Sequence, residues 1–205
     1  MVKMSARIPL IFVILVLTLV SIPRLQSGIS AAGEGQDRIG LPAPDLKLKY
    51  WLNSPPLEIN DLKGKVVLIR WWTDTCDLCA ATAPALRKLQ SEYGSHGLQV
   101  IGIFHPKPPG DWSVARMQRA AARFQFSFPV ALDGDWSALK RWWLNGAERS
   151  ATSVSFIVDK HGVIRYVHPG GEFHENSEGN SNHAVCERDF KTIDKTVAKL
   201  LAEPD

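Results

Sequence analysis

Residues 71–79 read Trp-Trp-Thr-Asp-Thr-Cys-Asp-Leu-Cys, and this stretch decides the fold. It follows an apolar run over residues 66–69 that is typical of a buried strand, and it opens an amphipathic helical pattern that ends near Tyr93. Cys76 and Cys79 therefore lie where a strand passes into a helix. The free backbone N–H groups and the positive end of the dipole at a helix N-terminus favour a thiolate. The Cys-x-x-Cys spacing also lets two sulfurs close a disulfide across one helical turn, which suits reversible thiol–disulfide exchange.

The use of cysteine favours a redox site over a structural one. The chain has 205 residues and three cysteines, so pairing Cys76 with Cys79 leaves Cys186 as an odd sulfur. A structural zinc site at the pair would need a second Cys pair or nearby histidines, and the sequence offers neither. Cys186 falls on the apolar stripe of the last helical pattern, where we expect it to act as a small hydrophobe. A third redox role stays open, because His183 lies three residues before it. The sequence predicts no metal site and no cofactor.

The N-terminus has the pattern of an export segment. Lys3 and Arg7 precede an uncharged apolar run over residues 8–23. As a helix, this run covers roughly 24 Å, which is short of the roughly 30 Å hydrocarbon core of a bilayer. We expect residues 1–32 to contain a cleaved signal peptide or an N-terminal membrane anchor, together with the start of a linker. Both alternatives place the folded part outside the cytoplasm, tethered through residues 8–23 or released.

Charge outside the export segment is balanced. The net charge of +3 is carried by Lys3, Arg7 and Arg24, and the rest of the chain has 21 basic and 21 acidic side chains. A neutral body without a basic stripe argues against nucleic-acid binding. The remaining length is enough for one well-buried domain, which we expect over residues 38–204 after the rest of the linker at residues 33–37.

The order of the sequence patterns predicts an α/β domain. Expected strands cover residues 46–50, 66–72, 98–104, 128–133, 153–158 and 163–167, and expected helices cover residues 76–93, 114–124, 136–143 and 186–200. The C-terminal helix should dock on the sheet through Phe190, Ile193 and Val197. This order implies a central mixed β-sheet with helices on both faces.

Several motifs together resemble the thioredoxin superfamily: the strand, the Cys-x-x-Cys helix, the crossover and the terminal hairpin. The opening Gly-Leu-Pro-Ala-Pro of residues 40–44 and the Gly-Lys-Val-Val-Leu of residues 64–68 narrow the resemblance to the extracytoplasmic TlpA/ResA-type thiol–disulfide oxidoreductases. Pro84 lies five residues after Cys79, where this superfamily commonly kinks its active-site helix.

The resemblance implies a thioredoxin-like α/β fold and an extracytoplasmic thiol–disulfide oxidoreductase. It implies that Cys76 is the attacking thiol and Cys79 the resolving one. The partners it implies are protein thiols and disulfides and a redox donor or acceptor protein.

Four further positions are candidate supporting residues. Ser153 stands where the superfamily usually has a cis-proline, and we expect a trans peptide between Thr152 and Ser153 because a cis bond before a non-proline residue costs about 2.5–4 kcal/mol. Without the proline ring, we expect Cys76 to be more open to small oxidants and metal ions. Arg70 replaces a buried acid and either lowers cysteine pKa values from beneath the site or points to the surface or into a salt bridge. Asp74, two residues before Cys76, completes this set.

Two other functions stay open. A peroxiredoxin-like thiol peroxidase is suggested by Thr73-x-x-Cys76, although Ile69 occupies the position of the proline in that motif. A copper(I) metallochaperone would use both thiolates and His105 as soft ligands. The simpler expectation for His105 is a surface residue in a proline-stiffened loop, with a role as proton donor or metal ligand as the alternative.

Overall fold

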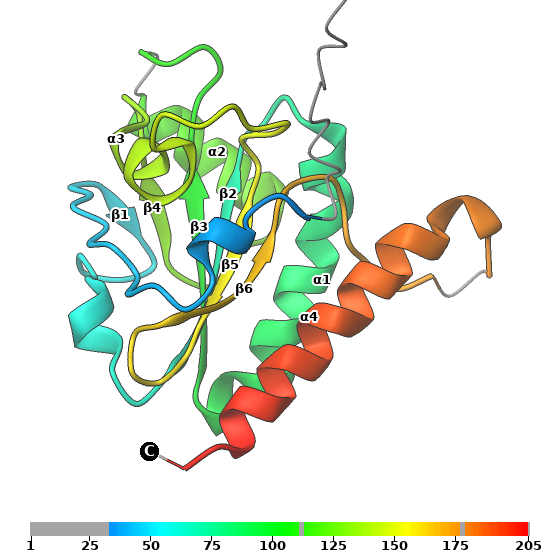
Figure 1. Cartoon of the computed structure of the whole chain (residues 1–205). Coiled ribbons are helices and arrows are strands. Elements are labelled where there is room, and N and C mark those ends of the chain that lie inside the picture. The colour runs from blue at the N-terminus through cyan, green and yellow to red at the C-terminus, as the bar shows by residue number, and fades with distance from the viewer. Residues whose placement is uncertain (1–32, 111–112, 177–178, 205) are drawn as a thin grey trace, which may run out of the picture.

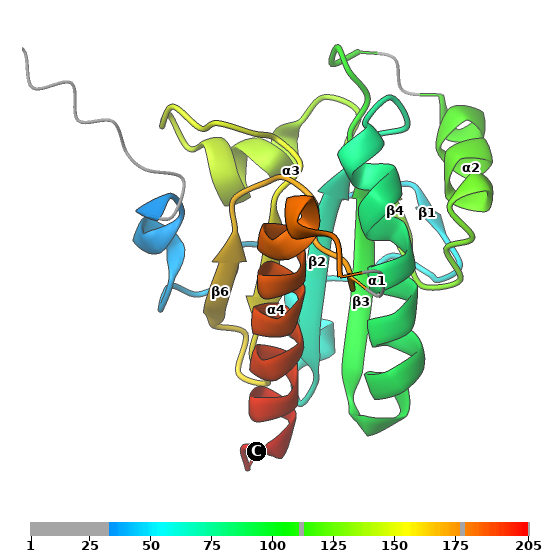
Figure 2. The ribbon, with the colours of Figure 1, turned by 90° about the vertical axis from the view of Figure 1, so that its right-hand side faces the viewer.

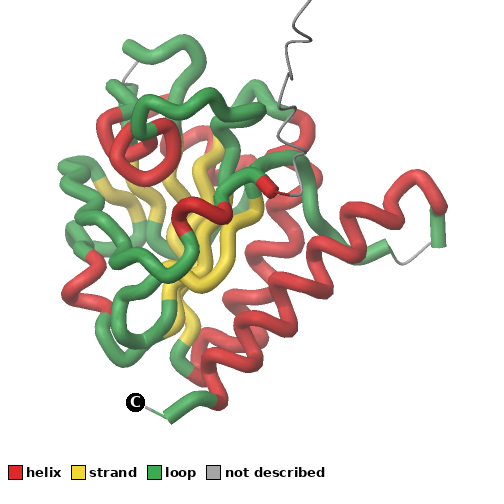
Figure 3. The backbone as a smooth tube through the Cα atoms, in the orientation of Figure 1, coloured by secondary structure: helices red, strands yellow, loops and turns green. Residues whose placement is uncertain are grey.

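The computed structural model describes residues 33–110, 113–176 and 179–204. Its centre is a six-stranded mixed sheet in the order β1-β4-β3-β2-β5-β6, drawn in yellow in Figure 3. β2 and β3 are parallel, as are β3 and β4, whereas β1 and β5 run antiparallel to their neighbours and β5 and β6 form a hairpin. The strands are β1 (Trp51–Leu52), β2 (Val66–Trp72), β3 (Leu98–Phe104), β4 (Val130–Leu132), β5 (Ser155–Val158) and β6 (Ile164–His168).

Helices cover both faces of the sheet, as the sequence predicts (Figures 1 and 2). One face packs against α1 (Asp77–Tyr93), α2 (Val114–Arg123) and α4 (Ala184–Ala202). The other face is covered by α3 (Ser137–Leu139), which continues into a π-helical turn at Lys140–Leu144, and by the segment before β2. Short 3₁₀ turns lie at Gln36–Arg38, Ile59–Leu62, Gly94–His96 and Ser181–His183.

β2 is a central strand that leads to the cysteines, which follow its carboxyl end. All seven of its residues are buried, as expected of a central strand with both faces covered. Leu68 and Trp72 pack on the side of α1 and α4, while Ile69 and Trp71 pack on the opposite side. Because side chains alternate along a strand, Arg70 lies on the same face as Leu68 and Trp72, beneath the helix that begins with the cysteines.

The C-terminal helix docks as predicted. Phe190, Ile193 and Val197 of α4 are all buried in the core on the α1 side of the sheet. Figure 2 shows α4 and α1 side by side over the strands. No helix among the residues that the structure describes is long and apolar enough to span a membrane.

The strand expected over residues 46–50 is wrong. Both carboxylate oxygens of Glu58 accept backbone N–H groups, from Leu46 and Lys47, each at 2.7 Å. Lys47 adopts a positive φ of 52°, which breaks the extended pattern. The paired strand is therefore β1, although Leu46 and Leu48 are buried as the alternation predicts.

The residues just before the expected domain contact it. The Glu34 carboxylate accepts hydrogen bonds from the backbone N–H and the hydroxyl of Ser150, at 2.8 and 2.5 Å. Asp37 forms an ion pair with Arg149 at 2.7 Å. Residues 33–37 thus pack on the fold, and the boundary at residue 38 stays a prediction. The export segment, residues 1–32, lies outside the described residues.

Candidate active site

Cys76 and Cys79 occupy unequal positions at the start of α1. Cys76 is the N-cap of the helix, and its sulfur accepts a hydrogen bond from the Cys79 backbone N–H at 3.2 Å. Cys76 is half-buried, whereas only 2% of Cys79 is exposed. Both cysteines are free thiols in the structure. An incoming molecule can therefore reach the first sulfur and not the second.

Arg70 is a buried cation beneath this pair. Its side chain is fully buried, so the expectation of a surface guanidinium does not hold. The guanidinium donates to the Ser155 hydroxyl at 3.1 Å and to the Gly171 carbonyl at 2.7 Å, and it lies 5.5 Å from the centre of the Phe173 ring. No ion pair joins Arg70 to a carboxylate among the described residues. The groups that can place a negative charge beside Arg70 are the two cysteines. The guanidinium is therefore placed to stabilise a thiolate.

The two thiols are tuned as a pair. Burial opposes ionisation of Cys79, but the Arg70 guanidinium and hydrogen bonds from Cys76 and Ser153 outweigh it and lower the pKa of Cys79. Burial raises the pKa of Cys76, as do its hydrogen bond to Cys79 and the charge on that neighbour. The pair therefore loses its first proton readily and its second reluctantly. The Arg70 charge and these hydrogen bonds favour the thiolate at the buried sulfur over the thiolate at Cys76.

The loop before β5 contacts the buried sulfur. The Cys79 thiol donates to the Ser153 hydroxyl at 3.3 Å, and this hydroxyl can donate in turn once Cys79 is ionised. The peptide between Thr152 and Ser153 is trans, as expected, since Lys107–Pro108 is the only cis bond among the described residues. Ser153 thus meets the cysteine with a hydroxyl, at the position where the resemblance leads us to expect a proline ring.

His105 is fully buried, so its expected place at the surface is wrong. Its Nε2 lies 3.0 Å from the hydroxyl of Thr152, the residue before Ser153, and its ring packs against Trp136. Burial and the nearby Lys107 charge lower the pKa of His105 to about 3. A neutral imidazole therefore supports the cysteine-contacting loop.

Asp74, in the segment between β2 and Cys76, contacts two arginines of α2. Its carboxylate forms a two-point ion pair with Arg116, at 2.8 Å for each contact, and its carbonyl accepts from Arg123 at 2.6 Å. Asp74 and Arg123 also line an open hollow of about 460 Å³ beside Cys76. Pro84, which lies inside α1 as expected, forms part of its wall.

The structure forms neither the Thr73–Cys76 contact of a thiol peroxidase nor a copper site with His105. The Thr73 hydroxyl, which a peroxidase would turn toward Cys76, donates to the Asp74 carboxylate at 3.3 Å. Cys76, Cys79 and His105 do not form a metal-ligating group among the described residues. His105 instead pairs with Thr152.

Comparison with known proteins identifies the family of the chain and relatives that are thiol-disulfide oxidoreductases by name. The profile of the AhpC/TSA family matches residues 39–167, which is more than half of the chain. The chain belongs to the AhpC/TSA family. It is 32% identical over 129 residues to the protein DipZ of Mycobacterium bovis, covering 61% of this chain and 18% of DipZ. It is 28% identical over 120 residues to the thiol-disulfide oxidoreductase ResA of Halalkalibacterium halodurans, covering 58% of this chain and 62% of ResA.

A solved structure shares the fold of this AhpC/TSA family member. A thiol-disulfide isomerase from Corynebacterium glutamicum matches with a TM-score of 0.60 at 23% identity, over 79% of this chain and 98% of the other. The predicted thioredoxin-like fold and the resemblance to thiol–disulfide oxidoreductases are confirmed. The chain spans less than two thirds of the length of either curated relative.

The sequence did not reveal what holds Arg70. Ser155 is paired with Arg70 across β2 and β5, so the side chains share a face, but this register is visible only in the folded sheet. The Gly171 carbonyl and the Phe173 ring come from the segment after β6, for which the sequence predicts neither a helix nor a strand. The sequence signal that this segment enters the core is Phe173, an apolar residue in an otherwise polar segment, which the structure buries fully.

Proposed function

We propose that this protein is a thiol–disulfide oxidoreductase that exchanges disulfides with protein partners through Cys76 and Cys79. One observation carries the proposal. A reachable sulfur caps α1, and a second sulfur with a lowered pKa is buried directly behind it, next to a guanidinium that has no carboxylate partner among the described residues. The names of the relatives, thiol-disulfide oxidoreductase among them, agree with this chemistry.

The proposed cycle uses the two sulfurs in turn. As Cys76 approaches a partner disulfide, its proton passes to Cys79 through their shared hydrogen bond. The Cys76 sulfur then bonds to one partner sulfur, the partner S–S bond breaks, and the other partner sulfur leaves and takes up a proton. Cys79 next loses its proton and attacks Cys76, which releases the second partner thiol. The partner gains two electrons and the Cys76–Cys79 disulfide forms; the reverse sequence oxidises a partner dithiol.

The hollow beside Cys76 is the proposed docking place for the partner chain. It combines the charged side chains of Asp77, Arg87 and Arg123 with the apolar Phe124 and Pro84. Peptide segments present the same mixture of backbone amides, charges and apolar groups. Cys76 forms one side of this hollow, so a bound segment lies next to the attacking sulfur.

We also propose that the protein works outside the cytoplasm. The basic residues and apolar run of residues 1–32 support export, and a dithiol site of this kind meets protein disulfides in oxidising compartments. Fractionation of cells that carry the tagged protein, with protease protection and the mass of the processed N-terminus, tests the location. It also separates a released form from one tethered through residues 8–23. Recovery of the full-length protein from the cytoplasm would contradict the proposal.

A mixed-disulfide trap tests the function. With Cys79→Ala, the bond between Cys76 and a partner persists because the resolving sulfur is gone, so adducts should appear on a non-reducing gel and vanish on reduction. Cys76→Ala should form none.

The remaining cysteine provides the control. Cys186→Ala in the Cys79→Ala background should leave the adducts in place. Adducts that depend on Cys186, or that form equally well without Cys76, would refute the assignment of Cys76 as the attacking thiol.

A further inference from the structure

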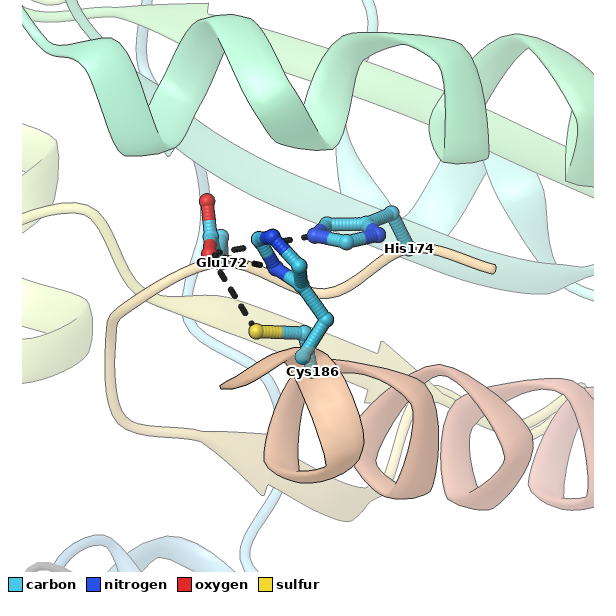
Figure 4. Close-up of side chains that lie close together, drawn as sticks. Glu172, His174 and Cys186 are labelled. Carbon is cyan, nitrogen blue, oxygen red and sulfur yellow. Dashed lines mark hydrogen bonds and ion pairs between the residues drawn. The ribbon is translucent and has the colours of Figure 1, made fainter. Parts of the chain in front are cut away.

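A second group of ionisable side chains lies at the start of α4, away from the Cys76–Cys79 pair. It consists of Glu172, His174, His183 and Cys186, and the four ligand atoms all lie within 4.8 Å of one another. Figure 4 shows Glu172 and His174 on the segment after β6, turned toward Cys186 on the first turn of α4. The proposed exchange chemistry uses none of these residues.

Two segments of the chain bring the four side chains to one point. Two anchors hold the segment that carries Glu172 and His174: the Gly171 carbonyl accepts from Arg70, and Phe173 is fully buried against the same guanidinium. In an extended segment alternate side chains share a side, so the inward Phe173 leaves Glu172 and His174 facing outward together. His183 is the N-cap of α4 and lies three residues before Cys186, so the two side chains come from the same end of the helix. A hydrogen bond from the His174 backbone N–H to the Cys186 carbonyl, 3.4 Å long, joins the two segments.

The ligand atoms point at a common place. Oε1 of Glu172 accepts the thiol proton of Cys186 at 3.2 Å and lies 3.6 Å from His183 Nδ1 and 3.8 Å from His174 Nε2. Nδ1 of His183 is buried and makes no hydrogen bond. His174 Nδ1 lies 2.8 Å from the Glu175 carbonyl, so it carries the proton and leaves the lone pair on Nε2, the atom that faces the cluster. A carbonyl that fixes the tautomer in this way is typical of histidines that bind metals.

We propose that Glu172, His174, His183 and Cys186 form a zinc site. One thiolate, two imidazoles and one carboxylate are four protein ligands of the types that Zn²⁺ binds in tetrahedral structural sites. A thiolate and a carboxylate together balance the charge of the ion. Ligand atoms of a zinc tetrahedron lie roughly 3.3–3.8 Å apart, given bonds of about 2.0–2.3 Å. The cluster is slightly wider, and rotation of the partly exposed Glu172 and His174 side chains brings it to that size.

Binding would displace the proton that Cys186 now shares with Glu172. The thiol becomes a thiolate bonded to zinc, and the proton is released to solvent. The ion would then fasten residues 172–174 to α4. Because Gly171 and Phe173 on this segment hold Arg70, the zinc site would steady one support of the buried guanidinium.

Zinc titration of the full-length chain tests the proposal, in a Cys76→Ser and Cys79→Ser background that removes the other thiols. The probe is Zn²⁺ alone, in competition with a chromophoric chelator. One ion should bind per chain with release of a proton, and Co²⁺ in its place should show thiolate charge-transfer and tetrahedral d–d absorption. Cys186→Ser, His174→Gln or His183→Gln should each weaken binding by about 100-fold or more, since loss of an outer-shell partner alone costs 10–100-fold.

Controls keep the test decisive. His161→Gln removes an exposed histidine outside the cluster and should leave zinc affinity unchanged. His174 is partly exposed, so the His174→Gln variant should remain folded even if another variant is unstable. Circular dichroism verifies that it is folded. The proposal is overturned if the background protein binds no Zn²⁺, if binding is insensitive to His174 and Cys186, or if the cluster takes copper(I) and not zinc.

Discussion

Two helices of this protein, α1 and α4, carry a buried cysteine in the first turn, and the charges beside these two cysteines are opposite. At α1, burial opposes ionisation of Cys79, but the Arg70 guanidinium together with hydrogen bonds from Cys76 and Ser153 outweighs burial and lowers the pKa of the thiol. At the start of α4, burial raises the pKa of Cys186, and the Glu172 carboxylate that accepts its proton raises it further. Both thiols lie near the positive end of a helix dipole, an effect typically worth only 0.3–1 kcal/mol. The charge beside each sulfur therefore acts in opposite directions: the Arg70 cation favours a thiolate at Cys79, and the Glu172 anion favours the protonated thiol at Cys186.

Removal of the Arg70 charge should produce the largest change in thiol pKa at either helix. Arg70→Gln should raise the pKa of the Cys76–Cys79 pair by about 1–3 units, because the thiolate loses its opposite charge. Each unit destabilises the reduced form by about 1.4 kcal/mol, so the reduction potential should become more negative by about 30 mV per unit. Alkylation rates against pH and equilibration with glutathione measure the two quantities.

Arg119→Gln is the matched control, since it removes an exposed arginine of α2. It should change neither value. An unaltered potential in a folded Arg70→Gln variant would show that the guanidinium serves packing alone.

Neutralisation of the Glu172 carboxylate should change the pKa of Cys186 in the opposite direction, and by less than Arg70→Gln changes the pKa of the Cys76–Cys79 pair. Glu172→Gln should lower the pKa of Cys186 by about 1 unit, because burial remains while the carboxylate charge is gone. The ultraviolet absorbance of the thiolate reports this pKa in the Cys76→Ser and Cys79→Ser background without metal. Glu187→Gln, in the first turn of the same helix, separates a direct effect from a general change in charge. Equal shifts in the two variants would mean that Glu172 has no special relation to the thiol.

The strength of the sequence patterns explains what could be predicted. β2, β3 and α1 follow from long runs with one clear period, and Cys76 and Cys79 follow from their place between two of them. The strand expected over residues 46–50 failed because its alternation is real but its backbone is captured by Glu58, a contact that periodicity does not reveal.

The parts of the site that stayed hidden depend on tertiary contacts. The proline-flanked sequence around His105 is typical of an exposed loop, yet the ring is buried against Trp136. The Cys186 interpretation considered one helix face alone, whereas Glu172 and His174 approach from a segment outside that helix. Alternation around a buried Phe173 could have suggested this pairing, but only once the segment was known to be extended.

A smaller effect, on the stability of the fold, is expected at Asp74, which lies two residues before Cys76. A hydrogen-bonded ion pair with Arg116 lowers the pKa of Asp74, so the ionised carboxylate stabilises the fold. This contribution is fully present above the ordinary carboxyl pKa of about 3.9 and is lost as the pH falls through the lowered folded value. Asp74→Asn should therefore reduce the unfolding free energy by roughly 1 kcal/mol at neutral pH and by less under acid conditions. Urea unfolding at several pH values measures the difference; exposed Asp45→Asn should show none, and a pH-independent loss would point to packing.

The smallest effect is expected at Ser153, the residue that replaces proline in this fold. Its hydroxyl lies 3.3 Å from the Cys79 sulfur and helps to lower the pKa of that thiol, although less than Arg70 does. Ser153→Ala removes one neutral hydrogen bond, typically worth about 1 kcal/mol, so the pKa should rise by at most about 0.7 unit. Ser153→Thr keeps the hydroxyl and should restore the original value, which separates the hydrogen bond from a change of shape. Alkylation rates of the pair against pH read out both variants. A rise equal to that of Arg70→Gln would mean that the loop, and not the buried cation, sets the thiolate charge.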